Sequence, residues 1–268
     1  MCRYLHVTGR RKPKVRERLN KSEKREYKCV NMKDNSEHPL RVVDVEKIYK
    51  VGERDYPALR GVSLAANRGE ILAILGPSGS GKTTLLDLMG TLDRPTKGKI
   101  FIDGIDTSNL NDTELSALRN KKIGFIFQSY NLVPYLSALE NVELSMLAGD
   151  SLNNEGKSRA VSLLTELGLG EKMEKKPREL SGGEQQRIAI ARALVNNPSI
   201  ILADEPTGNL DTKTSEAVIS ILNRMSSRNS AAIVLVTHEE DLAKDSDRII
   251  RLRDGRIEKE VRKHDKDK

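Results

Sequence analysis

The sequence predicts an α/β fold in which short strands alternate with helices and a helical segment is inserted between two groups of strands. Three observations support this prediction. The apolar run Ile71–Leu75 leads directly into a glycine-rich loop and then into a helical pattern. Two more apolar runs of strand length lie at Ile200–Ala203 and Ile233–Val236. Residues 136–176 lose the strand pattern and instead carry apolar side chains at helical spacing.

Each further element is predicted from its own pattern. Alternating apolar and polar residues indicate strands with one buried face, whereas short continuous apolar runs indicate strands buried on both faces. An Asp-Gly pair between two strand-like runs predicts a hairpin turn. The remaining predicted elements, in chain order, are strands at Arg41–Ile48 and Gly61–Ala66, a helix at Lys82–Gly90, strands at Lys99–Ile102 and Ile123–Phe127, a helix at Lys213–Met225, and a closing hairpin of Arg248–Leu252 and Arg256–Glu260 around Asp254-Gly255.

These patterns set the expected domain boundaries. Residues 1–40 form a basic N-terminal extension, 41–262 form the main domain with a helical subdomain at about 136–180, and 263–268 form a polar tail. The extension lacks apolar periodicity, which favours a solvated and disordered segment; binding to anionic lipid or RNA is the alternative. Met32 lies shortly before the first predicted strand and is a second candidate for the true start.

The net charge of the 268-residue chain is +7 and is confined to the extension. Residues 1–37 hold twelve Lys and Arg against five Asp and Glu, which leaves 34 basic and 34 acidic side chains in the remainder. The high isoelectric point therefore gives no reason to expect that the main domain binds nucleic acid. With 37% hydrophobic and 32% charged residues, the composition is that of a globular domain with a heavily charged surface.

The sequence does not predict that the chain itself crosses a membrane. No run approaches the ~18–20 apolar residues that a helical span needs. Even the apolar run Ile188–Val195 contains Arg192. The basic start is not followed by the apolar stretch of a signal peptide. Cys2 and Cys29 both lie in the extension, so the main domain cannot be held by disulfides. We therefore expect a cytoplasmic protein whose contact with any membrane is indirect and made through a partner.

A phosphate-binding loop is predicted directly after the first buried strand. The segment Gly76-Pro77-Ser78-Gly79-Ser80-Gly81-Lys82-Thr83 fits the P-loop pattern. Its glycines let backbone N–H groups turn toward phosphate oxygens, and the following helix N-terminus adds a favourable potential. Lys82 would reach the β- and γ-phosphates, and Thr83 would bind Mg²⁺. A flexible Gly/Ser loop without a ligand is disfavoured, because such loops rarely connect a buried strand to a helix. By itself the motif indicates nucleoside triphosphate binding.

Two acidic residues end the second buried strand. Asp204 would lie at its carboxyl end beside the P-loop, where it can hold Mg²⁺ through water, and Glu205 would then be the natural general base for attack of water on the γ-phosphate. Alone, the pair would be an ordinary solvated strand end; together with a P-loop, the catalytic interpretation is favoured. His238 follows the strand Ile233–Thr237 on the same edge, which favours a γ-phosphate contact over a simple turn residue.

A further segment does not belong to a generic P-loop enzyme. Leu180-Ser181-Gly182-Gly183-Glu184-Gln185-Gln186-Arg187 opens a helix with a serine and two glycines, and it is therefore a second candidate for anion binding. This peptide resembles the signature of the ATP-binding cassette (ABC) family, and the motifs of that family occur in order from about Arg41 to Glu260.

The resemblance implies a fold and a set of site residues. The implied fold is a P-loop ATPase core, a mixed sheet with flanking helices, joined to an antiparallel β subdomain and a helical subdomain. Ser181 and Gly182 would contact the γ-phosphate of an ATP held by an opposite subunit. The implied nucleotide-binding residues are Tyr49, Gly76, Pro77, Ser78, Gly79, Ser80, Gly81, Lys82, Thr83, Thr84, Ser181, Gly182, Gly183 and Asp211; the implied catalytic residues are Glu205, His238 and Gln128; and the implied metal ligands are Thr83, Gln128 and Asp204. Tyr49, the implied adenine-stacking residue, has Tyr56 nearby as an alternative.

The resemblance also implies a function. Ala58–Leu64, Phe127–Leu132 and Asp204–Asp211 are similar to the lipoprotein-release and macrolide-export subgroup. This implies an ATPase that uses ATP and Mg²⁺, pairs with a second ATPase subunit and powers a membrane permease. A mechanotransmission ATPase that regulates a membrane protein without transport is the alternative. A soluble ABC protein acting on ribosomes or DNA is disfavoured, since the chain has one P-loop and one signature.

Contact with the permease is expected from the segment after Gln128, residues 129–147. Tyr130, Leu132, Val133, Tyr135 and Leu136 form an apolar, aromatic-containing cluster there. A buried interface between lobes is the alternative explanation of the same cluster.

Overall fold

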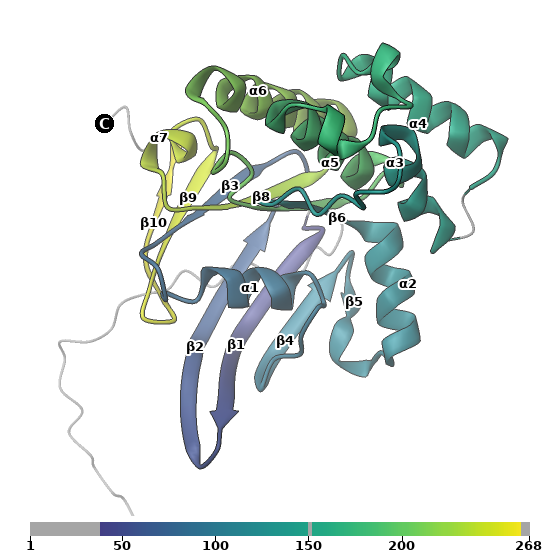
Figure 1. Cartoon of the computed structure of the whole chain (residues 1–268). Helices are drawn as coiled ribbons and strands as arrows, with labels where there is room; N and C mark the ends of the chain where they lie inside the picture. Colours follow the sequence, from purple (N-terminus) through teal and green to yellow (C-terminus); the bar gives the residue numbers. More distant parts are fainter. Residues whose placement is uncertain (1–37, 150–151, 264–268) are drawn as a thin grey trace, which may run out of the picture. The chain divides into compact units, whose positions relative to one another are not determined.

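The computed structural model describes residues 38–149 and 152–263. Nearly all of the predicted polar tail and of the predicted basic extension lies outside these residues. In the described part, the α/β prediction is confirmed. The described residues form two sheets, one mixed and one antiparallel, together with the helices that cover them (Figure 1).

The larger sheet has six strands in the order β10-β9-β3-β8-β7-β6. Strands β9, β3, β8, β7 and β6 run parallel, and β10 is an antiparallel edge strand. The strands are β3 (Ile71–Leu75), β6 (Ile123–Phe127), β7 (Ile200–Asp204), β8 (Ala232–Thr237), β9 (Arg248–Arg253) and β10 (Arg256–Arg262). Because the parallel strands end at the same edge, the loops that follow them gather there.

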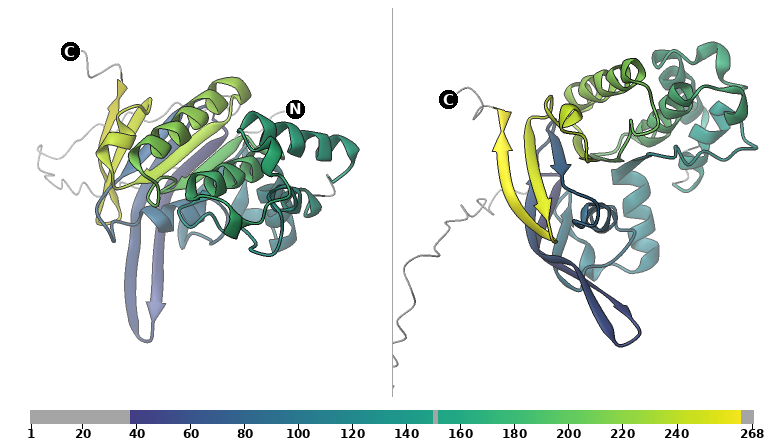
Figure 2. Two further views of the ribbon diagram at one scale, coloured as in Figure 1. Left: turned by 45° about the horizontal axis from the view of Figure 1, so that its top comes forward. Right: turned by 60° about the vertical axis from the view of Figure 1, so that its left-hand side comes forward.

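The smaller sheet is antiparallel and has four strands in the order β2-β1-β4-β5. Its long β1–β2 hairpin extends beyond the other strands (Figures 1 and 2). The strands are β1 (Leu40–Val51), β2 (Arg54–Ala66), β4 (Lys97–Ile102) and β5 (Ile105–Asp106). This sheet is the predicted antiparallel β subdomain.

The helices form layers around the mixed sheet (Figure 1). Helix α1 (Lys82–Met89) lies between the two sheets and shares one apolar core with both. Helices α5 (Gly182–Leu194) and α6 (Thr212–Asn229) cover the opposite face, next to α3 (Ala138–Leu147) and α4 (Asn154–Glu166), which occupy the predicted helical subdomain. The other helical segments are α2 (Asp112–Lys122), α7 (Glu240–Ala243) and short 3₁₀ turns at Thr107–Asn109, Gly170–Lys172 and Pro177–Glu179.

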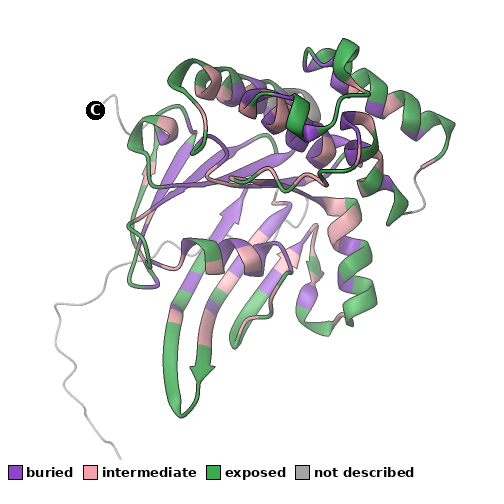
Figure 3. Ribbon diagram, in the orientation of Figure 1, coloured by how far each residue is buried: buried purple, intermediate pink, exposed green. Residues whose placement is uncertain are grey.

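The central strands β3 and β8 of the mixed sheet are buried along their whole length (Figure 3). In β8, Val234 packs toward α1, whereas Ile233 and Leu235 pack toward α5 and α6. This alternation explains why the strands appear in the sequence as continuous apolar runs. Burying one aliphatic side chain fully stabilises the folded state by about 1.5–3 kcal/mol relative to leaving it exposed. Polar side chains are therefore excluded from the strand interiors and placed at the strand ends.

Two helices were missed by the sequence analysis, α2 and the four-residue α7. Helix α2 buries only Leu115 and Leu118, so its apolar periodicity is too weak to recognise. Its available signal was the capping box of Asn111 and Glu114, in which each side chain accepts a hydrogen bond from the backbone N–H of the other. Within the described ranges, no helix has both the length and the apolar character that a membrane crossing requires.

Candidate functional site

The glycine-rich loop joins the carboxyl end of β3 to the start of α1. Gly79 and Gly81 have φ values of 77° and 101°, a conformation that L residues rarely adopt. Nothing lies within 4 Å of a Cβ built on Gly79, so this side of the loop is open. The Lys82 ammonium, which is buried, donates to the carbonyls of Gly76 and Pro77 at 2.7 and 3.0 Å. The loop therefore surrounds a positive charge and leaves open space beside Gly79.

Acidic groups lie at the carboxyl end of β7 and on α1. Burial, together with the nearby Glu205 and Asp87 carboxylates, raises the pKa of Asp204, and Lys82 partly opposes the shift. Burial also raises the pKa of Asp87 on α1. A cation beside Asp204 would relieve this repulsion, so the electrostatics of the site favour bound positive charge.

Glu205 and His238 are brought together from adjacent strands. The Nδ1 atom of His238 lies 2.7 Å from the Oε1 atom of Glu205, and the two residues follow β7 and β8. Glu205 has a φ of 43°, a strained backbone conformation for a residue with a side chain. Its N–H donates to the carbonyl of Val236 at 2.9 Å, which holds this conformation. The carboxylate is thus fixed by its backbone and by the imidazole.

Gln128 follows β6 and is held by the loop after β7. The Asn209 side-chain amide donates to the Gln128 carbonyl at 3.0 Å. A Cβ built on Gly208 would lie 2.6 Å from the Gln128 amide nitrogen, so this glycine gives the glutamine side chain its place. The predicted catalytic residues Gln128, Glu205 and His238 consequently share one edge of the sheet with the glycine-rich loop.

The two residues after Ser129 form a strained turn. Tyr130 and Asn131 have φ values of 59° and 50°. Arg192 on α5 donates to the carbonyls of Tyr130 and Asn131 at 2.7 and 2.5 Å. The guanidinium therefore stabilises a conformation that the backbone does not favour by itself.

The predicted signature peptide begins α5. Ser181 caps the helix, with its hydroxyl accepting from the Glu184 N–H at 3.4 Å and the Glu184 carboxylate accepting from the Ser181 N–H at 3.0 Å. Lys172 bonds to Glu184 at 2.5 Å and is the largest cause of the lowered pKa of that carboxyl. Ser181 remains exposed. A Cβ on Gly182 would lie 2.8 Å from the Tyr130 hydroxyl, so the peptide also contacts the strained turn.

The signature peptide and the glycine-rich loop belong to different parts of the fold. Helix α5 packs in the core on one face of the mixed sheet and α1 in the core on the other. Across residues 38–149 and 152–263, no hydrogen bond joins Ser181, Gly182 or Gly183 to Gly76–Thr83. Asp211 caps α6, accepting from the Thr214 N–H at 3.0 Å and from its hydroxyl at 2.8 Å.

Tyr49 lies in β1 with its hydroxyl 3.2 Å from Asp93. Its hydroxyl also interacts with Thr84 in the first turn of α1, which places the ring near the glycine-rich loop. The Lys47 ammonium lies 4.9 Å from the ring centre. Tyr56 in β2 is directly opposite Tyr49. Both aromatic residues therefore remain candidates for the ring that stacks on adenine.

Sequence reasoning missed three residues that organise the site. Arg192 holds the turn after Gln128, Asn209 holds Gln128 itself, and Gln186, which is fully buried, donates to the Pro206 carbonyl at 2.7 Å. Each side chain donates a hydrogen bond to a backbone carbonyl that is distant in the sequence. No local sequence pattern indicates such a partner.

The residues present fit a nucleotide and a divalent cation. The loop offers open space beside Gly79, the buried Lys82 and the hydroxyl of Ser80, which is buried and has no hydrogen-bond partner among the described residues. Thr83, Gln128 and Asp204 supply oxygen donors, which are the ligands that Mg²⁺ prefers.

We predict that Arg192→Met loosens the turn after Gln128. Loss of two charge-assisted hydrogen bonds should cost about 1–3 kcal/mol, and amide exchange over residues 128–133 should accelerate. Exchange measured by mass spectrometry checks this. Arg119→Met is the matched control, since Arg119 donates at 2.9 Å to the Thr91 carbonyl instead. Equal exchange over 128–133 in wild type and Arg192→Met would contradict the prediction.

Comparison with known proteins agrees with this geometry. The ABC transporter family model matches residues 59–208. The lipoprotein-releasing system ATP-binding protein LolD of Aquifex aeolicus is 47% identical over 222 residues, which are 83% of this chain and 97% of that protein. The macrolide export ATP-binding/permease protein MacB of Syntrophobacter fumaroxidans is 50% identical over 82% of this chain, which spans 31% of the MacB length.

Solved structures show the same fold. A dimeric structure of the ATP-binding cassette MJ0796 in a post-hydrolysis state, bound to ADP and Pi, has a TM-score of 0.77 and 45% identity over 84% of this chain and 98% of its own. The cbiO1 protein of Clostridium perfringens has a TM-score of 0.76 and 26% identity over 85% of this chain and 90% of its own. From its fold, its motifs and these relatives, the chain belongs to the ABC transporter family as an ATP-binding-cassette ATPase of the type found in MacB and LolD.

Proposed function

We propose that this ATPase powers a separate membrane permease of an export or lipoprotein-release transporter, at the cytoplasmic face of the membrane. The observation that carries the proposal is the set of groups at the carboxyl edge of the mixed sheet. The glycine-rich loop, Gln128, Glu205 and His238 follow four neighbouring parallel strands there. The similarity to LolD along nearly its whole length supports the assignment to this type of transporter.

In this proposal the glycine-rich loop binds the phosphates of ATP. Lys82 neutralises the β- and γ-phosphates, and the backbone N–H groups of Gly79, Gly81 and Lys82 donate to their oxygens. Thr83, Gln128 and Asp204 hold Mg²⁺, which when bound draws charge from the phosphate oxygens. Tyr49 or Tyr56 stacks on the adenine.

Glu205 is the general base. Its carboxylate takes a proton from the water that attacks the γ-phosphate. The contact of 2.7 Å with His238 fixes the orientation of the Glu205 carboxylate, and His238 would bind the same phosphate from the neighbouring strand end. The strained backbone at Glu205 fixes the carboxylate before substrate arrives, which lowers the cost of reaching the reactive arrangement.

The exposed Ser181–Gly182 peptide completes the site of a second subunit. In a head-to-tail pair with twofold symmetry, each signature peptide would cover the ATP held by the partner, so two sites form across one interface. The dimeric state of the MJ0796 cassettes supports this arrangement. Asp211, at the exposed start of α6, would lie at the same interface.

The permease would dock beside Gln128. A cleft of about 360 Å³ opens there, and its lining includes Phe125, Phe127, Asn131, Ser145, Ala148 and Arg192. The rings of Phe125 and Phe127 stack 5.5 Å apart. In the adjoining segment Tyr135 is 83% exposed, whereas Leu132 packs against the core. The apolar cluster after Gln128 is thus partly packed inside the fold, through Leu132, and partly exposed to solvent, through Tyr135.

We predict that Lys82→Ala abolishes measurable ATP binding, because several phosphate charges are left without their cation. Calorimetric titration with Mg-ATP checks this. Glu205→Gln is the contrasting variant: it should bind ATP normally and hydrolyse it about 10²–10⁴-fold more slowly, the usual scale for loss of a general base. Normal ATP affinity in a folded Lys82→Ala protein would refute the assignment of the loop.

We also predict that Glu205→Gln forms a stable dimer with Mg-ATP and a monomer with ADP. Slow hydrolysis preserves the γ-phosphate contacts, of which His238 makes its own within one subunit and Ser181 makes its own across the interface. Light scattering gives the mass in each nucleotide. A monomer with ATP shown to be bound, also in the presence of the permease, would rule out the paired site.

Substituting Tyr135→Glu should spare basal ATPase activity and abolish co-purification with the permease from detergent-solubilised membranes. Its exposure means that the charge does not disturb the core, but it would oppose docking on an apolar partner surface. Val161→Glu is the control, since Val161 is 40% exposed on α4, outside the docking segment. If the Tyr135→Glu protein still co-purifies, the permease docks elsewhere.

A further inference from the structure

The β9–β10 hairpin lies against the glycine-rich loop. Strand β9 pairs parallel with β3, with Leu75 opposite Arg251, so both strands end at the same edge. The turn Asp254–Gly255 that follows β9 therefore reaches the loop that follows β3. Asp254 and Gly255 have φ values of 47° and 72°, the pattern of a type I′ turn.

Gly255 joins the loop to the antiparallel sheet through its peptide group. Its N–H donates to the Ser80 carbonyl at 3.0 Å, and its carbonyl accepts from the Arg60 N–H at 2.9 Å. Ser80 lies in the middle of the loop, and its own N–H donates to Pro77 at 3.2 Å. One residue thus connects the loop, β2 and the hairpin.

These contacts leave no room for a side chain at position 255. A Cβ on Gly255 would lie 2.6 Å from the Ala58 carbonyl oxygen and 3.1 Å from the Leu59 Cα. A Cβ on Gly81 would lie 2.6 Å from the same Ala58 oxygen. A Cβ built on Gly76 would lie 2.3 Å from the Leu252 carbonyl oxygen. The loop is therefore enclosed by backbone on two sides.

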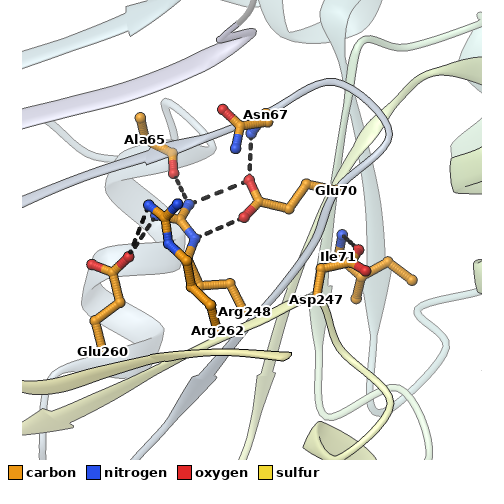
Figure 4. Close-up of polar contacts among 8 residues, drawn as sticks. All are labelled: Ala65, Asn67, Glu70, Ile71, Asp247, Arg248, Glu260 and Arg262. Atoms are coloured by element: carbon orange, nitrogen blue, oxygen red, sulfur yellow. Dashed lines mark hydrogen bonds and ion pairs between the residues drawn. The ribbon is translucent and has the colours of Figure 1, made fainter. Parts of the chain in front are cut away.

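The base of the hairpin is fixed by a buried ion pair (Figure 4). Arg248, at the start of β9, bonds to Glu70 at 2.7 Å, to the Ala65 carbonyl and to Glu260 of β10 at 3.2 Å. Glu70 also accepts from the Asn67 N–H at 2.6 Å. Arg248 and Glu70 are 6% and 9% exposed, so neither charge can separate from the other without a large penalty.

We propose that the β9–β10 hairpin is a positioning element for the phosphate-binding loop and that Gly255 is its positioning residue. Fixed at its base by Arg248 and at its tip by Ser80, the hairpin holds the loop in the shape that receives a triphosphate. ATP would then meet a preformed site and would not have to order the loop. This inference rests on the proposed role of Gly76–Thr83, and it extends the site past the residues that the family model matches.

The test is the substitution Gly255→Ala, measured in the full-length chain. Mg-ATP titration by calorimetry should show about tenfold weaker binding, because a misplaced loop loses the equivalent of one or two hydrogen bonds. At saturating ATP, kcat should stay within about twofold of wild type, so the change falls on KM. In the nucleotide-free protein, amide exchange over residues 76–85 should accelerate.

Gly168→Ala is the matched control. Its φ of 73° imposes the same backbone strain, but nothing lies within 4 Å of the built Cβ, so its ATP affinity should equal that of wild type. Both proteins are compared well below their melting temperatures. If Gly255→Ala does not fold, Arg60→Pro takes its place in the same comparison, since it removes the N–H that donates to the Gly255 carbonyl, in the edge strand β2, and adds no Cβ at position 255.

The possible outcomes separate the two proposals. Wild-type ATP affinity and wild-type exchange in Gly255→Ala, or in Arg60→Pro where it takes its place, or an equal loss in Gly168→Ala, would overturn the positioning role. Failure of the wild-type chain to bind ATP, or normal binding by Lys82→Ala, would instead overturn the proposed role of the loop.

Discussion

The parallel pairing of β9, β3, β8, β7 and β6 is the constraint on which the rest of the structure depends. Because helices or the second sheet cover both faces of the central strands β3, β8 and β7, the interiors of these three strands accept only apolar side chains. Parallel strands also end together, so every loop with polar groups emerges along one edge. The chemistry of the site is therefore a consequence of how the sheet is buried.

Backbone carbonyls accept the side-chain hydrogen bonds that hold several of these loops in place. Gln186 bonds to Pro206, Asn209 to Gln128, and Arg192 to Tyr130 and Asn131. A carbonyl acceptor fixes the path of a loop and leaves its side chains free to bind ligand. Such bonds also hold the left-handed conformations of Tyr130 and Asn131, which would relax without them.

The sequence was sufficient to predict the fold class, most strands and the motifs, because each depends on a local pattern. Ile71–Leu75 and Ile123–Phe127 were predicted with the bounds that the structure shows. Helix α2 was missed because its two buried leucines carry too little periodicity. Arg192 stood out only as a charge inside an apolar run. Its two acceptors lie 61 and 62 residues away in the sequence, a distance that no local pattern spans.

The order of the strands determines which groups can cooperate. Along the edge, the residues that follow β9, β3, β8, β7 and β6 are in turn the Gly255 turn, the glycine-rich loop, His238, Glu205 and Gln128. His238 meets Glu205 because β8 and β7 are neighbours. The inner loops are supported by neighbours on both sides, whereas the outermost ones need outside support. Gly255 receives it from β2, and the turn after Gln128 receives it from Arg192 on α5. Because α5 also begins with the signature peptide, a shift of that helix would act on the Gln128 end of the site first, while the phosphate-binding end stays fixed to the two sheets.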